Sequence, residues 1–161
     1  MIIAFDKLET LREKYKGKTI VLGSGVFDLL HYGHVSYLRQ LKEYGDIVVV
    51  MTKSDLRIKT HKSPLRPIIP EQDRAKMVDA LKGVDYVFIG PYKPDTNAQL
   101  DQTYEAAFAA LHPDVFVTTN DEWKKLKAIT QARIVTLPRT GQAAHGSTTA
   151  IIEHIKAVHK S

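Results

Sequence analysis

The stretch Gly23-Ser24-Gly25-Val26-Phe27-Asp28-Leu29-Leu30-His31-Tyr32-Gly33-His34 determines how the rest of this chain is interpreted. It follows the run Thr19–Leu22, typical of a buried strand, and precedes Val35, Leu38 and Leu41, whose spacing of three residues fits one helix face. The stretch is therefore a crossing from a strand to a helix. Its glycines let the backbone bend and approach a phosphate, and its two imidazoles can point at one ligand. The sequence predicts an anion site with two titratable donors.

Three other interpretations fit the same residues. Gly23 and Gly25 could open a dinucleotide-binding turn, although Asp28 stands where that motif has its third glycine. His31 and His34 could be metal ligands, although the chain has no cysteine and no carboxylate at a recognised ligand spacing. They could also be two unrelated surface histidines. We favour phosphate chemistry over all three.

Residues Gly25–His34 resemble the G-x-F-D-x-x-H-x-G-H signature of the cytidylyltransferase-like nucleotidyltransferases. The signature sets particular side chains at fixed offsets in a strand, loop and helix context, so it is far more specific than a glycine-rich loop alone. The resemblance covers nearly the whole chain after about residue 18. It implies an enzyme that transfers a nucleoside monophosphate from ATP or CTP to a small phosphorylated sugar or polyol and releases pyrophosphate.

Size and composition favour one domain in the cytoplasm. A chain of 161 residues can bury a sizeable core, and we expect a single nucleotidyltransferase domain over 1–161. The absence of cysteine excludes disulfides and a thiolate nucleophile. No apolar run approaches the roughly 18 residues that span a bilayer, and nothing resembles a signal peptide. The net charge of +5 is spread along the chain, which favours attraction of a triphosphate over nucleic-acid binding.

Apolar segments alternate with helical patterns along the whole chain. This alternation predicts an α/β fold: a Rossmann-like, doubly wound five-stranded parallel sheet in a single domain. Ligands of such folds bind at the carboxyl ends of the strands, where the strand order reverses. We expect strands at 19–22, 47–51, 84–90, 114–118 and 133–137, and helices at 7–15, 35–44, 70–82, 98–111, shortly after 123, and from 147 onward.

Residues 52–70 show neither helical nor strand periodicity and are expected to form a long, basic loop. Loops of this length inside compact domains are more often functional than idle, although a solvated flap without a role is the alternative. The helix that follows begins at Pro70–Asp73, and Arg74 shares its inward face. Residues Lys62–Arg74 resemble the K-G-x-x-R-P-I-x-P-E-x-x-R pattern of adenylyltransferases that act on heptose 1-phosphate. By that resemblance Lys62 and Arg74 contact phosphates.

The segment Ser147–Thr149 opens the last helix with three hydroxyl side chains. Such residues often serve only as helix caps. The alternative is a second anion site, because hydroxyls, free N–H groups and the helix dipole all favour phosphate oxygens. Residues 146–151 are similar to the family's closing S-T-T-x-I motif, which binds the nucleotide phosphates.

The later part of the chain gives a second likeness. Residues Asp114–Val117, Asp121–Trp123 and Leu137–Thr140 resemble glycerol-3-phosphate cytidylyltransferase. Val26 departs from the cytidylyltransferases, which carry threonine there, and Gly141–His145 lengthens the loop before the closing motif. The middle of the chain thus indicates adenylyl transfer to a sugar 1-phosphate, and the later part indicates cytidylyl transfer to a polyol phosphate.

The family resemblance assigns roles to individual residues. We expect Mg²⁺ to be shared among the phosphate oxygens, with no residue assigned as a metal ligand, and a homodimer by analogy with the family. Asp28 is expected to order the loop by hydrogen bonding rather than to do chemistry. The catalytic residues are His31, His34, Lys62 and Arg74; the nucleotide-binding residues are Gly25, Val26, Phe27, Gly33, Arg139, Ser147, Thr148 and Thr149; the substrate-binding residues are Asp28, Asp121 and Trp123.

Two rival functions use some of the same features. A non-catalytic module that senses ATP or CTP needs the glycines and hydroxyls but not both imidazoles together with Lys62. An RNA-binding domain predicts an affinity for RNA that falls steeply with salt. The joint presence of His31, His34 and Lys62 favours the enzyme.

Overall fold

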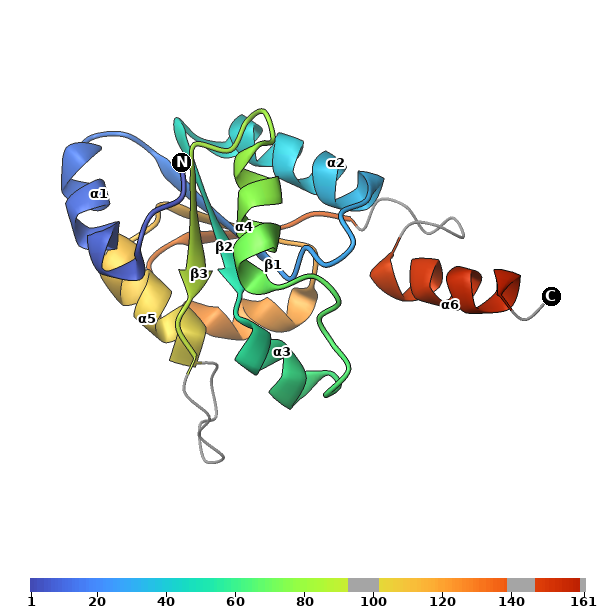
Figure 1. Cartoon of the computed structure of the whole chain (residues 1–161). Helices are drawn as coiled ribbons and strands as arrows, with labels where there is room; N and C mark the ends of the chain where they lie inside the picture. Colours follow the sequence, from blue (N-terminus) through green and yellow to red (C-terminus); the bar gives the residue numbers. More distant parts are fainter. Residues whose placement is uncertain (93–101, 139–146, 160–161) are drawn as a thin grey trace.

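The computed structural model describes residues 1–92, 102–138 and 147–159, in which one parallel sheet is flanked by helices (Figure 1). This confirms the predicted α/β class. The strands are β1 (Ile20–Gly25), β2 (Ile47–Lys53), β3 (Tyr86–Gly90), β4 (Val115–Thr118) and β5 (Arg133–Thr136). The α-helices are α1 (Leu8–Lys14), α2 (Tyr32–Gln40), α3 (Asp55–His61), α4 (Glu71–Asp79), α5 (Gln102–Leu111) and α6 (Thr148–Val158), and the 3₁₀ helices are η1 (Phe5–Lys7), η2 (Leu41–Tyr44) and η3 (Asp121–Ala128).

The sheet has the strand order β3-β2-β1-β4-β5, and all four neighbouring pairs are parallel. The chain runs outward from β1 to β3 and then returns to place β4 on the other side of β1. The strand order therefore reverses between β1 and β4. Ligands of open parallel sheets bind outside the carboxyl ends of the strands at such a point.

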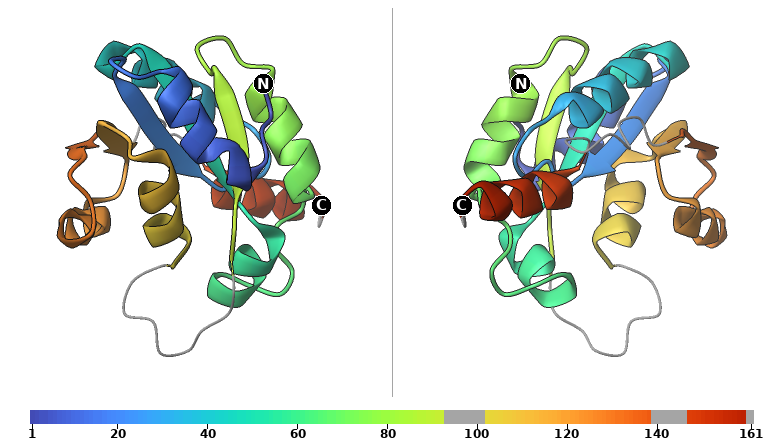
Figure 2. Two further views of the ribbon diagram at one scale, coloured as in Figure 1. Left: turned by 90° about the vertical axis from the view of Figure 1, so that its left-hand side faces the viewer. Right: turned by 90° about the vertical axis from the view of Figure 1, so that its right-hand side faces the viewer.

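Each face of the sheet is covered by its own helices. On one face, α1, α5 and η3 pack on the alternate strand residues Ile20, Leu22, Val49 and Met51. On the other face, α2, η2 and α4 pack on the residues between them, such as Val21. Figures 1 and 2 show α1 and α5 together on one side of the sheet, with α6 at the far side of the molecule from α1. Strands buried on both faces are apolar without alternation, as the sequence indicated.

The segment 52–70, predicted as an irregular loop, contains a helix. β2 continues to Lys53, and α3 follows directly after Ser54, whose hydroxyl oxygen accepts a hydrogen bond from the Arg57 backbone N–H at 3.3 Å. Ser54 and Asp55 form an ordinary helix start, with a capping hydroxyl and an acidic first turn. Apolar periodicity missed α3 because one of its two buried residues is Arg57.

The glycines of the motif lie inside β1 rather than in the bend after it. A Cβ atom on Gly25 would lie 2.6 Å from the Phe27 ring, and one on Gly23 would lie 2.4 Å from Leu41 Cδ1. These positions lack a side chain because the neighbouring side chains occupy the space. The bend itself is made by Phe27 and Leu29, whose φ angles of 55° and 49° lie in the left-handed region that non-glycine residues rarely adopt.

The buried side chain of Arg74 stabilises the bend at Phe27 and Leu29. Its side chain has 0% exposure, and its guanidinium donates four hydrogen bonds: to the carbonyl oxygens of Val26, Lys53 and Ile69, and to Asp55 Oδ1 at 2.6 Å. These acceptors belong to three segments that meet at the carboxyl ends of β1 and β2. The planar fork of arginine suits several fixed acceptors at once.

No helix in the described ranges is long and apolar enough to cross a membrane. The last helix, α6, contains no buried residue. It is joined to the body at its first turn, where the Thr148 hydroxyl donates a hydrogen bond of 2.6 Å to the Asp28 carbonyl oxygen.

Replacing the buried guanidinium of Arg74 is expected to destabilise the fold at the carboxyl ends of β1 and β2. Arg74→Met leaves Asp55 and three carbonyl groups without their donor, so we expect the free energy of unfolding to fall by about 3 kcal/mol or more. Urea unfolding measures this loss. The matched control Lys76→Met, exposed on the same helix, is expected to change it by less than about 0.5 kcal/mol. Equal effects of both substitutions would contradict this account.

Candidate active site

A cavity of about 420 Å³ opens at the carboxyl ends of the strands, at the reversal point between β1 and β4. Its walls come from the end of β1, the loop into α2, the end of β2, the segments after β4 and β5, and the first turn of α6. Eleven of the residues predicted to act together line it: Gly25, Val26, Phe27, His31, Gly33, His34, Lys62, Trp123, Ser147, Thr148 and Thr149.

Asp28 fixes the loop that carries the histidines. Its fully buried carboxylate accepts hydrogen bonds from the backbone N–H groups of Ile68 and Ile69 at 3.0 to 3.1 Å, and it forms an ion pair of 3.1 Å with Arg66. These contacts hold Asp28 between the two residues with positive φ. Asp28 therefore orders the loop, as expected, and it is not among the residues that line the cavity.

The two imidazoles form a stacked pair at the start of α2. His31 is the residue before the helix, His34 lies in its first turn, and their ring centroids are 3.8 Å apart. The edge of Phe27 packs on His34 at a centroid distance of 5.3 Å. Both Nδ1 atoms are buried and have no hydrogen-bond partner in the described part of the chain. Ring nitrogens in this state can bond an incoming oxygen.

Burial makes both imidazoles weak bases. It is the main reason that the pKa of His34 is lowered to about 4. The charge of His31 lowers this pKa further, Asp28 raises it, and Lys62 has the smallest, lowering effect. Burial also lowers the pKa of His31. Both rings are therefore neutral at pH 7 in the free protein, and each can donate one N–H.

The first turn of α6 presents hydroxyl groups to the same cavity. The Ser147 hydroxyl oxygen accepts a hydrogen bond of 3.2 Å from the Ala150 backbone N–H, which makes Ser147 a helix cap. This contact uses a lone pair, so the hydroxyl proton can still be donated to a ligand. Thr148 uses its proton in the bond to Asp28. The capping role and the cavity-lining position thus coexist in the same residues.

Sequence reasoning missed two basic residues of the cavity, Lys53 and Arg66. Lys53 ends β2, and its position just after a predicted buried strand was the available signal, because strand ends meet at this edge. Arg66 lies in the segment held by Asp28. Together with Lys62 they give the cavity a basic lining, which suits a polyanion.

Besides Asp28, two predicted site residues, Arg74 and Asp121, do not line the cavity. The guanidinium of Arg74 donates its hydrogen bonds to protein oxygens and does not line the cavity. Arg74 therefore positions the surrounding loops and does not make the predicted contact with phosphate. Asp121 is exposed at the start of η3, and an ion pair of 2.9 Å with Lys124 lowers its pKa. Arg139 lies outside the described residues.

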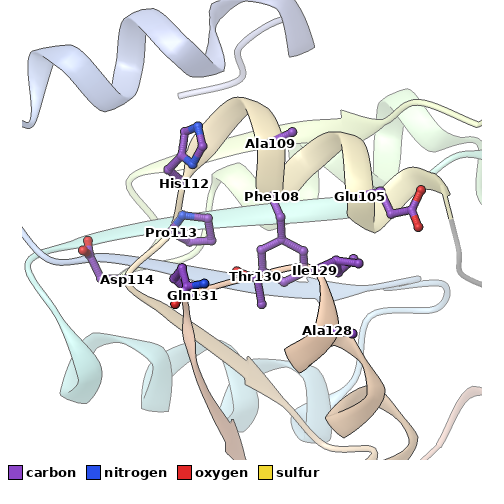
Figure 3. A pocket seen from close by; sticks show the side chains of 10 residues that line it. All are labelled: Glu105, Phe108, Ala109, His112, Pro113, Asp114, Ala128, Ile129, Thr130 and Gln131. Carbon is purple, nitrogen blue, oxygen red and sulfur yellow. The ribbon is translucent and has the colours of Figure 1, made fainter.

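A larger hollow, of about 750 Å³, lies near the amino ends of β4 and β5 (Figure 3). Phe108 and Ile129 line its floor, with Glu105, His112 and Asp114 at its rim. The described residues that line it include two carboxylates and no lysine or arginine. A polyanion is disfavoured there, so chemistry rather than size identifies the smaller cavity as the candidate site.

The parallel sheet and the basic, hydroxyl-bearing cavity at its reversal point define an α/β protein suited to bind phosphates. The chain belongs to the cytidylyltransferase-like family, whose match covers residues 22–154. The family predicted from the motif is thereby confirmed.

Named relatives share this similarity. Bifunctional protein HldE of Helicobacter pylori (strain G27) is 40% identical over 157 residues, which are 96% of this chain and 31% of that protein. The protein of the same name from Syntrophotalea carbinolica is 41% identical over 116 residues, 72% of this chain and 21% of that protein. The chain thus spans about a third or less of these relatives. The crystal structure of a lipopolysaccharide core biosynthesis protein from Thermoplasma volcanium GSS1 superimposes with a TM-score of 0.64 at 26% identity, covering 78% of this chain and 100% of that chain.

An NMR titration of the histidine rings tests the electrostatics of the cavity. We expect His34 to titrate near pH 4 in the free protein and at a higher pH with ATP bound, because a nearby polyanion favours the charged ring. Between about pH 6.5 and 4 the unfolded chain binds the proton first, so stability falls as the pH falls through this range. His34→Gln assigns the signal. A free-protein pKa of 6.5 or above would contradict the buried, neutral pair.

Proposed function

We propose that this protein transfers a nucleoside monophosphate from a nucleoside triphosphate to a small phosphorylated acceptor. One observation carries the proposal: the paired imidazoles and the hydroxyls of Ser147–Thr149, more than a hundred positions apart in the sequence, line the same cavity. Together these groups offer a triphosphate donors from two distant parts of the sequence. Family membership supports the same reaction class.

The reaction needs no general base. An oxygen of the acceptor phosphate forms a bond to the α-phosphorus, the bond from that phosphorus to the bridging oxygen breaks, and its electron pair leaves with pyrophosphate. The acceptor oxygen carries no proton at neutral pH. Catalysis can then rest on positioning and charge neutralisation.

The cavity residues supply those two effects. The neutral rings of His31 and His34 donate N–H groups to triphosphate oxygens, where negative charge grows as the bridging bond breaks. Lys62 neutralises the same region, and Ser147 with the N–H groups of α6 holds the far phosphates. Gly25 and Val26, at the end of β1, line the cavity and can present backbone groups to the nucleotide.

Mg²⁺ is part of the proposal as a partner of the triphosphate. Within the described ranges no three His, Asp or Glu side chains form a metal-binding group. Mg²⁺ at phosphate sites keeps several waters and binds largely through phosphate oxygens, and a hydroxyl such as that of Ser147 is an acceptable further ligand. When bound, the ion neutralises phosphate charge.

We propose adenylyl transfer to a heptose 1-phosphate as the particular reaction. The resemblance of Lys62–Arg74 to adenylyltransferases of this type supports it, as do the relatives named HldE and the lipopolysaccharide core biosynthesis protein. Cytidylyl transfer to glycerol 3-phosphate is the second candidate, favoured by the sequence likeness of Asp114–Val117, Asp121–Trp123 and Leu137–Thr140. We further propose a homodimer that works in the cytoplasm, by analogy with the family.

Nucleotide and acceptor screens test this proposal. We expect ATP with Mg²⁺ to raise the melting temperature more than CTP, GTP or UTP, because a ligand of the folded state stabilises it. Pyrophosphate release is expected with ATP and heptose 1-phosphate together. Release with CTP and glycerol 3-phosphate instead would favour the second candidate. Nucleotide binding without release in any combination would favour a sensing module.

Two single substitutions test the assigned chemistry. His34→Ala and Lys62→Ala are each expected to lower the rate of pyrophosphate release about 100-fold or more, since each removes a contact to developing charge. The melting temperature should change little for Lys62→Ala because this side chain is exposed. Lys59→Ala, exposed on α3, is the control and should keep the wild-type rate. A near-normal rate for His34→Ala would refute the mechanism.

A further inference from the structure

The two faces of the sheet supply different walls to the cavity. Side chains alternate between the faces along a strand. In β2, Val49 and Met51 point to the face covered by α1 and α5, so Lys53, two residues further, emerges on that same side. Phe27, which packs against the imidazole of His34, belongs to the cluster on the opposite face. Lys53 and the histidine pair therefore line opposite walls of one cavity.

The wall around Lys53 is aromatic. The Lys53 Nζ atom lies 5.2 Å from the centre of the Trp123 indole and 5.7 Å from the centre of the Tyr104 ring. These two rings are 4.3 Å apart, and the Tyr104 hydroxyl is 2.5 Å from the Ser24 hydroxyl. The ammonium group is thus placed by cation–π contacts on a fixed aromatic surface.

Within the described ranges, no carboxylate lies within ion-pair distance of Lys53. Asp28 and Asp55, which lie at the same edge of the sheet, are paired with Arg66 and Arg74. Burial, with the charges of Arg57 and Lys62, lowers the pKa of Lys53 to about 7. A cation held among other cations in a part-buried wall is stabilised by an incoming anion.

That anion is a second substrate group rather than the triphosphate. The triphosphate has its donors on the other side, in the histidine pair and the first turn of α6. Lys62 lines the same cavity, and its charge lowers the pKa of both His34 and Lys53. Two anions bound at the two walls would meet near Lys62.

We propose that Lys53 binds the phosphate of the acceptor and that Trp123 supports the carbon skeleton of the same molecule. This inference rests on the proposed function and specifies its second substrate: a dianionic phosphate monoester of a polyol or sugar. Lys53 is then a specificity-determining residue. It presents the attacking phosphate to the α-phosphorus from the side opposite the imidazoles.

Steady-state kinetics with heptose 1-phosphate and with glycerol 3-phosphate tests this assignment. Lys53→Met keeps the length and apolar contacts of the side chain but removes the charge, and Lys53→Arg keeps the charge. We expect Lys53→Met to raise the KM for the acceptor about tenfold to a hundredfold with little change in the KM for the nucleotide, and Lys53→Arg to restore much of the loss. Lys59→Met is the control for a lysine outside the cavity. A rise in the nucleotide KM alone would overturn the proposal.

The pH profile gives a second readout. Above about pH 7 the wild-type kcat/KM for the acceptor should fall as Lys53 loses its proton, whereas Lys53→Arg should remain flat there. Arg57, Lys62, His61 and Tyr104 face Lys53 in both proteins, so the difference between the two profiles reports on Lys53. Identical profiles would contradict the assignment.

Direct binding separates this inference from the proposed function. Calorimetry with inorganic phosphate, in the presence of a non-hydrolysable ATP analogue, should show binding to the wild type and loss of that binding in Lys53→Met. Loss of phosphate binding without any transferase activity in the wild type would refute the proposed function but keep the anion site. Equal binding to both proteins would refute the anion site even where transfer occurs.

Discussion

The hydrogen bonds of one buried guanidinium set the shape of the functional edge. Arg74 rises from α4 and joins the carbonyl groups of Val26, Lys53 and Ile69, which end or follow three different parts of the chain. Without this cation, those carbonyls would be directed into a buried space without donors. The Arg74 hydrogen bonds therefore fix the relative positions of three segments: the histidine loop, the end of β2 and the segment after α3.

Asp28 complements this arrangement with the opposite charge. Its carboxylate accepts hydrogen bonds from the N–H groups of Ile68 and Ile69, while Arg74 donates hydrogen bonds to carbonyl oxygens of the same region. Between them they hold two left-handed residues, Phe27 and Leu29, whose backbone geometry would otherwise cost energy. The charges of Arg74 and Asp28 are both paired within the protein and have a structural role. The cavity is lined instead by Lys53, Lys62 and the imidazoles.

The fold was predictable because buried parallel strands are apolar and turn signals separate them, as at Ile47–Met51. The convergence of His31, His34 and Ser147 was predictable because strand ends and helix starts meet at one edge. Arg74 was predicted to face inward, but pattern alone could not show that protein oxygens occupy its guanidinium. α3 was missed because one of its two buried residues is Arg57. Lys53 was missed because its surroundings depend on Trp123, which lies far away in the sequence.

The hydrogen bond between the Thr148 hydroxyl and the Asp28 carbonyl connects the histidine loop to the first turn of α6, the two segments that we propose to bind the polyanion. The last helix has no buried residue of its own, so this loop is a fixed point for its first turn. A displacement of either element strains this hydrogen bond. If the cavity binds a polyanion as proposed, a ligand that orders the histidine loop also restricts the first turn of α6 through this bond.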